Sequence, residues 1–471
     1  MHRRVRQIHF LGIGGIGMSG LAELLHRQGY AVSGSDLAEG ATVERLRNLG
    51  VSVAIGHAAS QVGNADVLVY SSAIRGNNPE LLEAEQRKIP IIPRAEMLAE
   101  VMRLQDGIAI AGTHGKTTTT SLVAHVLAAA GLDPTAVIGG RVITAGAGER
   151  EQPEDRRGVL LGEGRLLVAE ADESDGSFLR LAPVLAVVTN IDPEHLDHYG
   201  SFEALQDAFV DFANCIPFWG LAVLCFDHPG VQAILPRLTR RYMTYGFSGQ
   251  ADLTATSLEP DGFGVRFGVR RHGEVLGSAR VPLPGRHNVA NALAALAVAL
   301  ELEIPFETAA SSLNEFAGIE RRFERKGEAR GVLFVDDYGH HPAEVRATLS
   351  AARDVHSGRV VVVFQPHRYT RTRDCFEEFA TAFNEADVLV LCEIYAAGED
   401  KIPGIDGRAV AEAIRAHGHR DVRYASELDE VVASLPSKLQ AGDLVITLGA
   451  GNVSSLGPRL LAAVDRRGGG S

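Results

Sequence analysis

The chain has 471 residues, a length that corresponds to roughly three domains of ordinary size. Apolar residues make up 45% and charged residues 22%, as in globular proteins, and no uncharged apolar run reaches the roughly 18 residues of a membrane span. The formal net charge of −13 argues against a general binder of nucleic acids or anionic membranes. Four scattered cysteines without C-x-x-C spacing favour reduced thiols. We therefore expect a cytoplasmic protein with neither a membrane nor a nucleic-acid partner.

Short apolar runs alternate with helical patterns in the first hundred residues. The pattern predicts strands over 5–13, 30–36 and 65–74 and helices over 18–29 and 42–50. Such an alternation is typical of a parallel, doubly wound sheet. We expect a Rossmann-like domain over residues 1–105.

A second unit begins with a strand, a glycine turn and a helix over 106–131. The pattern then predicts strands over 165–175 and 185–192, antiparallel strands over 251–285 with turns at 260–262 and 271–273, and a helix over 287–302. We expect a central P-loop-type α/β domain with extra antiparallel strands over 106–318.

A third alternation follows, with predicted strands over 331–339, 359–366, 386–395 and 443–451 and a helix over 341–353. It indicates a second Rossmann-like α/β domain over 319–471. The fold class is therefore α/β with three domains.

The first motif is Gly12-x-Gly14-x-x-Gly17, between a strand and a helix. Glycines let the backbone approach a diphosphate, and the helix start offers free N–H groups. Asp36 ends the next strand, where a carboxylate could bond a ribose hydroxyl. NAD(H) is the default ligand of such a motif. The alternative is a tight turn that only serves helix packing, and the motif itself leaves the identity of the diphosphate open.

The second motif runs from Gly112 to Thr120 and reads GTHGKTTTT. Lys116 and Thr117 stand where a P-loop places its phosphate lysine and its Mg²⁺-binding hydroxyl. Only two residues separate Gly112 from Gly115, where the strict P-loop has four. A threonine-rich helix cap is the alternative, but a glycine turn between strand and helix favours binding of ATP-type phosphates.

The third motif is the acidic strand end that begins at Glu170. Carboxylates at this edge of a parallel sheet would face the P-loop and ligate Mg²⁺, and Glu170 follows the apolar run most closely. The alternative is a solvated acidic loop. His195 follows the next strand, but its chemistry alone does not favour a Mg²⁺ ligand, because Mg²⁺ prefers oxygen.

Two polar clusters follow strands of the third unit, DDYGHHP from Asp336 and QPHRYTRT from Gln365. Arg368 and Arg371 offer bidentate recognition of carboxylate or phosphate. A solvated loop is the alternative, but two adjacent strand ends carrying His, Asp and Arg favour a substrate site.

With these blocks in order, the chain resembles the Mur ligase family of ATP-dependent peptidoglycan precursor ligases. The resemblance covers nearly the whole chain and rests on GIGGIGMSG, GTHGKTTTT, AEADESD, NIDPEHLDHYGS, GRHNVANALAA, ERRFE, DDYGHHP, QPHRYTRT and LGAGN. The first block and DDYGHHP favour the branch that adds the first amino acid. The resemblance implies UDP-N-acetylmuramate and L-alanine as substrates, ATP and Mg²⁺ as cofactors, and a monomer or weak homodimer.

The resemblance also assigns roles to matching residues. It implies that the UDP-sugar is bound by Gly12, Gly14, Gly15, Gly17, Asp36, Ser71 and Ser72. It implies that ATP is bound by Gly112, Thr113, His114, Gly115, Lys116, Thr117, Thr118, His287, Asn288, Asn291 and Arg322. Thr117, Glu170 and His195 match Mg²⁺ positions, which overrules the chemical argument against the histidine. Arg368 and Arg371 would hold substrate in the third domain, and His341 or Asp337 could take the amine proton.

One departure from the family is visible. Several members carry a carbamoylated lysine in the central domain as a Mg²⁺ ligand, whereas this chain has no lysine between Thr117 and Arg325. A carboxylate or water must replace it, which is consistent with the role expected for Glu170.

Three other functions remain open at this point. A ligase that recycles a tripeptide onto the same UDP-sugar would share most motifs. An NAD(P)-dependent oxidoreductase would explain Gly12–Gly17 and Asp36 but not GTHGKTTTT. A non-catalytic nucleotide sensor would explain both loops but not the polar strand ends of the third domain.

Overall fold

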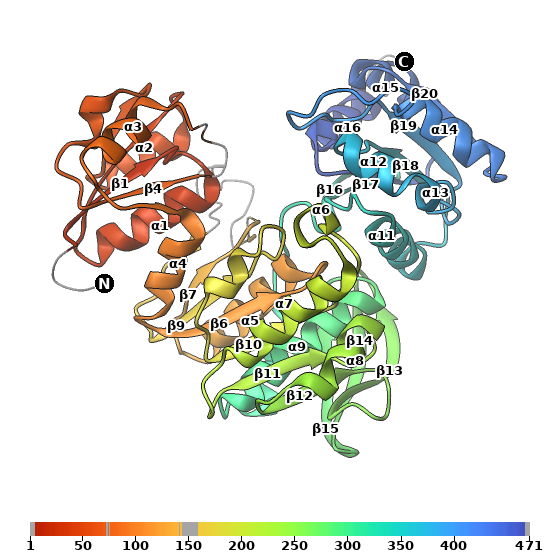
Figure 1. Ribbon diagram of the computed structural model, residues 1–471. Helices are drawn as coiled ribbons and strands as arrows, with labels where there is room; N and C mark the ends of the chain where they lie inside the picture. Colours follow the sequence, from red (N-terminus) through yellow and green to blue (C-terminus); the bar gives the residue numbers. More distant parts are fainter. Residues whose placement is uncertain (1–4, 72–73, 75, 141, 144–158, 467–471) are drawn as a thin grey trace. The chain divides into compact units, whose positions relative to one another are not determined.

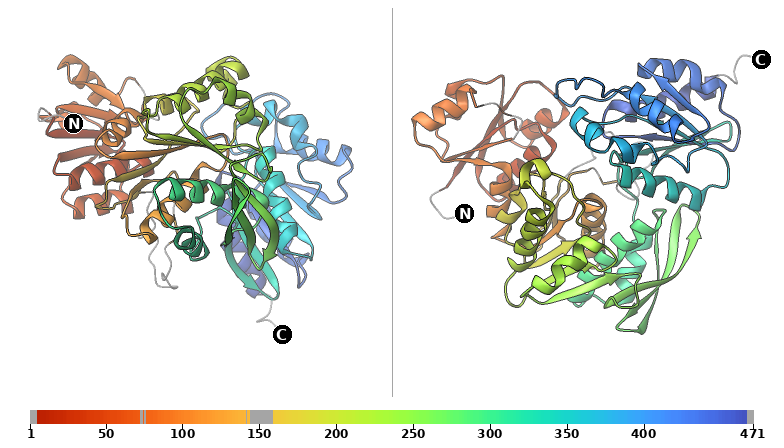
Figure 2. Two further views of the ribbon diagram at one scale, coloured as in Figure 1. Left: turned by 90° about the horizontal axis from the view of Figure 1, so that it is seen from below. Right: turned by 45° about the vertical axis from the view of Figure 1, so that its right-hand side comes forward.

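The computed structural model describes residues 5–71, 74, 76–140, 142–143 and 159–466 (Figures 1 and 2). The chain divides into two compact units. One comprises Met1–Ser257, Phe267–Ala279 and Ala290–Ala317, and the other comprises Leu258–Arg266, Arg280–Val289 and Gly318–Ser471. Within the described ranges, every helix is too short or too polar to span a lipid bilayer.

The first sheet has five parallel strands in the order β3-β2-β1-β4-β5. Its strands are β1 (Gln7–Leu11), β2 (Ala31–Asp36), β3 (Ser52–Ile55), β4 (Val67–Tyr70) and β5 (Ile91–Pro93), and its helices are α1 (Ile16–Arg27), α2 (Ala41–Asn48), α3 (Pro79–Gln86) and α4 (Arg94–Met102). The predicted alternation is confirmed, but β3, β5, α3 and α4 were missed. Both strands have only three or four residues, too few to show a period.

Helices cover both faces of this sheet because the strand order reverses at β1. Ile8 and Phe10 point into the core that includes Leu21 of α1. Leu11, of opposite parity in β1, points into the core that includes Leu81 of α3. The carboxyl ends of all five strands therefore remain available at one edge.

The second sheet has ten strands in the order β15-β14-β13-β12-β11-β10-β6-β9-β7-β8. Its strands are β6 (Asp106–Ala111), β7 (Thr135–Val137), β8 (Val159–Leu160), β9 (Leu166–Glu170), β10 (Leu185–Val188), β11 (Leu221–Cys225), β12 (Tyr242–Gly246), β13 (Leu253–Asp261), β14 (Gly264–Arg271) and β15 (Glu274–Val281). Two-residue turns join β13, β14 and β15, so neighbouring strands there run antiparallel, as predicted. The helices are α5 (Lys116–Ala129), α6 (Leu196–Tyr199), α7 (Phe202–Asn214), α8 (Pro229–Ile234), α9 (Arg286–Glu301) and α10 (Phe306–Asn314).

The third sheet has six strands in the order β16-β17-β21-β18-β19-β20. They are β16 (Glu324–Ala329), β17 (Val332–Asp337), β18 (Val360–Phe364), β19 (Val388–Cys392), β20 (Val422–Ala425) and β21 (Leu444–Leu448). Only β16 is antiparallel to its neighbour. The helices are α11 (Pro342–Val355), α12 (Tyr369–Asp374), α13 (Phe376–Phe379), α14 (Gly407–Ala416), α15 (Leu428–Ser434) and α16 (Leu456–Arg466), and separate apolar cores lie on the two faces.

Candidate functional site

The first glycine motif forms the turn between β1 and α1. Gly12 has a φ of +79°, and its N–H donates to the Ser35 carbonyl over 2.9 Å. The Gly14 N–H donates to Asp36 Oδ2 over 2.8 Å, and a Cβ on Gly14 would lie 2.8 Å from that oxygen. In the structure Asp36 therefore holds the glycine turn, a role that the sequence did not reveal.

The turn leads into the first helix without a side-chain cap. Gly15 is the N-cap residue, and no side chain accepts a hydrogen bond from the first turn of α1 at this cap. A helix start of this kind presents backbone N–H groups and a positive dipole end to an anion. The arrangement fits the predicted diphosphate site.

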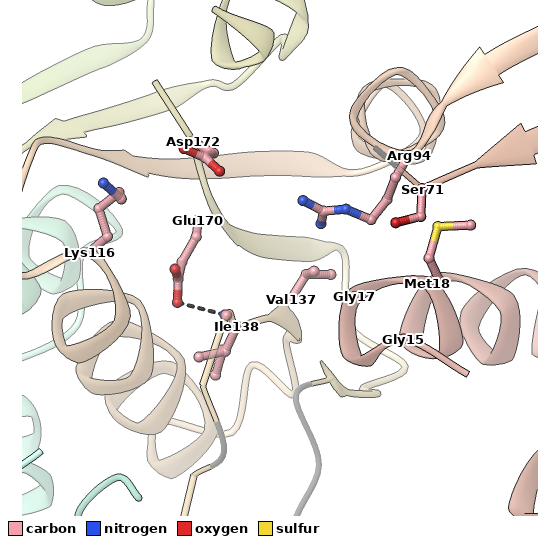
Figure 3. A pocket seen from close by; sticks show the side chains of 11 residues that line it. Gly15, Gly17, Met18, Ser71, Arg94, Lys116, Val137, Ile138, Glu170 and Asp172 are labelled. Carbon is pink, nitrogen blue, oxygen red and sulfur yellow. Dashed lines mark hydrogen bonds between the residues drawn. The ribbon is translucent and has the colours of Figure 1, made fainter. Parts of the chain in front are cut away.

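A cavity of about 370 Å³ joins the first glycine motif to the second (Figure 3). Its lining residues are Gly15, Gly17, Met18, Ser71, Arg94, Lys116, Val137, Ile138, Gly139, Glu170 and Asp172. The structure thus brings together the predicted residues Gly15, Gly17, Ser71, Lys116 and Glu170. The predicted Ser72 lies outside the described residues.

The second glycine motif forms the turn between β6 and α5. Gly112 has a φ of +129°, and a Cβ there would lie 2.1 Å from Thr189 Oγ1. Gly115 has a φ of +82°, and a Cβ there would lie 2.8 Å from Asn291 Oδ1. Side chains at these positions are excluded by both backbone conformation and space, which is the geometry of a phosphate-binding turn.

The end of the neighbouring strand β10 fixes this turn. Asn190 Oδ1 accepts from the His114 N–H over 2.7 Å, while the Asn190 amide donates to the His114 carbonyl over 2.9 Å. Thr189 Oγ1 donates to the same carbonyl over 2.6 Å, and Thr113 Oγ1 accepts from the Asp192 N–H over 2.9 Å. These hydrogen bonds hold the turn in place.

Lys116 forms a buried ion pair with Glu173. Its Nζ lies 2.9 and 2.8 Å from the two carboxylate oxygens and donates to the Gly112 carbonyl over 2.7 Å. Burial alone would lower the pKa of Lys116, but the charge and hydrogen bonds of Glu173, together with the charges of Asp172 and Glu170, outweigh burial and raise it. Lys116 is therefore a fixed positive charge at the turn.

Sequence reasoning missed Glu173. Its side chain is 1% exposed, whereas Asp172 one residue earlier is exposed, and the Tyr199 hydroxyl donates to the Glu173 carbonyl over 2.5 Å. The loop after β9, and not the strand pattern, decides which carboxylate turns inward. No feature of the sequence EADESD, residues 170–175, distinguishes Glu173 from its neighbouring carboxylates.

The predicted Mg²⁺ residues lie around this ion pair. Thr117 is buried in the first turn of α5, and Glu170 lines the cavity while its Oε1 accepts from the Gly139 N–H over 2.7 Å (Figure 3). His195 begins α6 with a φ of +56°, and its Nε2 lies 3.9 Å from Glu173 Oε1. A hydroxyl and several carboxylates form an oxygen-rich donor set that suits Mg²⁺.

A second charged cluster supports the same turn. Asp192 Oδ2 lies 3.4 Å from His114 Nε2, and Asp192 Oδ1 lies 3.3 Å from His228 Nε2. These two histidine contacts hold the pKa of the Asp192 carboxyl well below its ordinary value. His228 precedes α8 and was not singled out from the sequence.

The remaining nucleotide candidates are distributed over α5 and the start of α9. Thr118 is buried in α5, and Asn291 Oδ1 accepts from the Thr119 hydroxyl over 3.2 Å, which joins α9 to α5. Asn288 is buried and donates to the Pro284 carbonyl over 2.7 Å, whereas the neighbouring His287 is exposed. These two belong to the second compact unit.

In the second unit, Asp337 ends β17 in a fully bonded position. Its Oδ1 accepts from the Gly339 N–H over 2.8 Å and from the Thr348 hydroxyl over 3.1 Å. Its Oδ2 accepts from the Phe323 N–H over 2.8 Å, and burial raises the pKa of this carboxyl. The side chain holds the loop after β17 together.

His341 and the arginines lie on nearby segments of the same unit. His341 caps α11, with Nδ1 accepting from the Ala343 N–H over 3.3 Å and Nε2 3.5 Å from Cys375 Sγ. Arg368 is exposed and precedes α12 with a φ of +69°, while Arg371 is half-buried on that helix. Both arginines thus follow β18, at the expected edge of the sheet.

Arg321 organises the same edge and was not assigned a role from the sequence alone. Its guanidinium donates to the carbonyls of Gly449 and Gly451, in the loop after β21, and stacks 4.8 Å from the Tyr338 ring centre. The guanidinium of the predicted Arg322 lies 5.1 Å from the same ring centre. Aromatic faces attract such cations.

The glycine requirement of the second turn can be tested by substitution. Gly112→Ala should destabilise the protein by at least about 1–3 kcal/mol and weaken ATP binding, because the new Cβ meets Thr189 and the backbone conformation is unfavourable for alanine. Thermal denaturation and ATP titration measure both effects. Gly131→Ala is the matched control, since its φ is also positive at +79° but no atom lies within 4 Å of the added Cβ. Equal ATP affinity in the two variants would contradict the assignment.

Three family models match successive parts of the chain. The Mur ligase family catalytic domain matches residues 7–106, the Mur ligase middle domain matches 110–299, and the Mur ligase glutamate ligase domain matches 321–451. Together they cover most of the chain.

Similar proteins cover nearly the whole length. A UDP-N-acetylmuramate–L-alanine ligase of Myxococcus xanthus is 55% identical over 98% of this chain and 95% of its own length. A protein of the same name from an Anaeromyxobacter species is 57% identical over 98% of both chains. The crystal structure of the UDP-N-acetylmuramate–alanine ligase of Thermotoga maritima has a TM-score of 0.80 at 27% identity and covers 99% of this chain and all of that chain. A murein peptide ligase from Psychrobacter arcticus has a TM-score of 0.69 at 25% identity, with 98% of each chain covered. The chain thus belongs to the Mur ligase family.

Proposed function

We propose that the protein joins L-alanine to the carboxylate of UDP-N-acetylmuramate and converts ATP to ADP and phosphate. The observation that carries this proposal is a cavity that is lined both by the first glycine turn and by Lys116 and the acidic end of β9. Such a cavity suits a reaction in which the acid substrate meets a nucleotide phosphate. Relatives more than half identical in sequence carry the corresponding name.

The substrates are assigned to parts of the chain by the residues that fit them. The UDP-sugar belongs to residues 1–105, with its diphosphate at Gly12, Gly14, Gly15 and Gly17 and with Asp36, Ser71 and Ser72 in support. ATP belongs to residues 106–318, with its phosphates on the turn from Gly112 to Thr118 and on Lys116. L-Alanine belongs to residues 319–471, beside Arg368 and Arg371.

The reaction needs two displacements. A carboxylate oxygen of UDP-N-acetylmuramate attacks the γ-phosphorus of ATP, the bond to the β-phosphate oxygen breaks, and ADP leaves. The amine of L-alanine then attacks the acyl carbon, and the carbon–oxygen bond to phosphate breaks. Lys116 is fixed where it would neutralise phosphate charge, so its contribution is positioning and electrostatic stabilisation.

Magnesium has a suitable set of ligands in this chain. Thr117, Glu170 and His195 would hold it, while the Glu173 carboxylate, 3.9 Å from His195 Nε2, is paired with Lys116. Mg²⁺ supplies neutralisation of phosphate charge when bound.

The amine loses a proton during the second displacement. Of the two predicted bases, His341 fits better than Asp337, because the Asp337 oxygens already accept three hydrogen bonds. His341 Nδ1 accepts from the Ala343 N–H over 3.3 Å, so the neutral ring carries its hydrogen on Nε2, and Nδ1 is the nitrogen that can receive a proton. We propose His341 as the group that receives the proton, directly or through water.

A substrate panel tests the function. Phosphate release should require ATP and UDP-N-acetylmuramate together with L-alanine, and the product should gain the mass of one alanine residue. Glycine, L-serine and the tripeptide of the recycling reaction serve as competing acceptors. Turnover with the tripeptide as acceptor but not with L-alanine would overturn the proposal in favour of the recycling ligase. A nicotinamide absorbance change would favour the oxidoreductase.

Lys116 should be essential for phosphate transfer but not for binding of the sugar nucleotide. We expect Lys116→Met to lower kcat by at least about 100-fold, because a charge aimed at the transferred phosphate is lost, while the Kd for UDP-N-acetylmuramate stays the same. Lys438→Met, at an exposed lysine, is the control.

Loss of Lys116 also leaves the buried Glu173 carboxylate without the lysine that neutralises its charge. Lys116→Met/Glu173→Gln removes both charges and should recover thermal stability without recovering turnover. Normal turnover by either Lys116 variant would contradict the phosphate-site assignment.

A further inference from the structure

Arg94 lines the cavity but has no role in the interactions described so far. It is the first residue of α4 and follows β5, so it lies at the same carboxyl edge as the first glycine turn and Ser71. In Figure 3 its guanidinium points into the space between Ser71 and Asp172. Its guanidinium has no hydrogen-bond or ion-pair partner among the residues that the structure describes. A guanidinium in a cavity, with no partner among these residues, is suited to bind an anion.

Gly17 is shaped around Arg94. A Cβ on Gly17 would lie 2.9 Å from Arg94 Nη1 and 3.3 Å from Arg94 Cδ. Gly17 lies in the first turn of α1, and its φ lies outside the positive range, so the backbone there would accept alanine. Space for the Arg94 side chain is therefore the local reason for glycine at this position.

Positive charge accumulates at this point, and no carboxylate among the residues that the structure describes forms an ion pair with Arg94. The Arg94 guanidinium lies beside the N-terminal end of α1, and the residue Arg94 is itself the first residue of α4. A cation near the start of a helix is electrostatically unfavourable. Glu96, the acidic residue in the first turn of α4, is bound to Arg180 instead. A ligand with more than one negative charge would relieve all three positive sites.

We propose that Arg94 binds the diphosphate of the UDP-sugar, opposite the N–H groups at the start of α1. Arg94 is placed on the glycine-turn side of the cavity, whereas Lys116 and Glu170 occupy the side toward the nucleotide turn (Figure 3). Diphosphate rather than the reactive carboxylate is therefore its partner. A guanidinium donates paired hydrogen bonds to phosphate oxygens, which suits this position. The inference rests on the proposed function, because it presupposes a UDP-sugar substrate.

Equilibrium binding without ATP tests this role. Arg94→Gln should weaken binding of UDP-N-acetylmuramate roughly 10- to 100-fold, as expected for losing hydrogen bonds to a charged group. UDP-N-acetylglucosamine has the same diphosphate but no lactyl carboxylate, so its Kd should rise by a similar factor. The KM for ATP should not change. Arg94→Lys should recover part of the affinity, because it keeps the charge but not the paired geometry.

Two further variants make the test specific. Arg103→Gln at the other end of α4, where the side chain is half exposed and paired with Glu100, should bind both UDP-sugars like wild type. Gly17→Ala should displace Arg94, so adding Gly17→Ala to Arg94→Gln should cost less affinity than Gly17→Ala costs alone.

The failures are distinguishable. Wild-type protein that binds neither UDP-sugar would refute the proposed function itself. Wild-type binding with unchanged affinity in folded Arg94→Gln would refute only the role of Arg94. A loss confined to UDP-N-acetylmuramate would place Arg94 on the lactyl carboxylate and overturn the diphosphate assignment. A raised KM for ATP would likewise overturn it.

Discussion

The nucleotide side of the cavity depends on the buried ion pair between Lys116 and Glu173. Burying two charges costs solvation free energy that only close, well-hydrogen-bonded geometry repays, and here both carboxylate oxygens lie within hydrogen-bonding distance of Nζ. The pair joins the start of α5 to the loop after β9. It therefore fixes the phosphate lysine and the acidic strand end relative to each other before any substrate binds.

The same constraint explains why glycines and small polar residues surround this point. In this turn the Lys116 side chain donates to the Gly112 carbonyl, four residues earlier in the chain. The turn needs positive φ angles at Gly112 and Gly115, which glycine adopts readily. The first glycine turn contains no lysine. There Asp36 accepts a hydrogen bond from the backbone of the turn, and the Arg94 side chain lies over Gly17. Charge on the two sides is thus supplied by different means, although both turns connect a parallel strand to a helix.

Much of the fold could be predicted because its long strands and helices have clear periods. The strands that were missed, such as β3 and β5, are too short to show one. The positions of the glycine turns and of the polar strand ends were predictable, because residues that follow parallel strands meet at one edge of the sheet; the functional roles of these residues stay predictions. Glu173 and Arg94 were not predicted, because their roles depend on which way a loop or a long side chain turns. The catalytic role of Asp337 stays a prediction: its position after β17 suggested chemistry, and its three accepted hydrogen bonds show that it also holds the loop together.

An oxygen-isotope experiment tests the acyl-phosphate route most directly. UDP-N-acetylmuramate labelled with ¹⁸O in both carboxylate oxygens is turned over with ATP and L-alanine, and the released phosphate is analysed by mass spectrometry. Attack of the carboxylate on ATP transfers one labelled oxygen to every phosphate released, while the other stays in the new amide. Unlabelled phosphate formed together with the amide product would contradict this route.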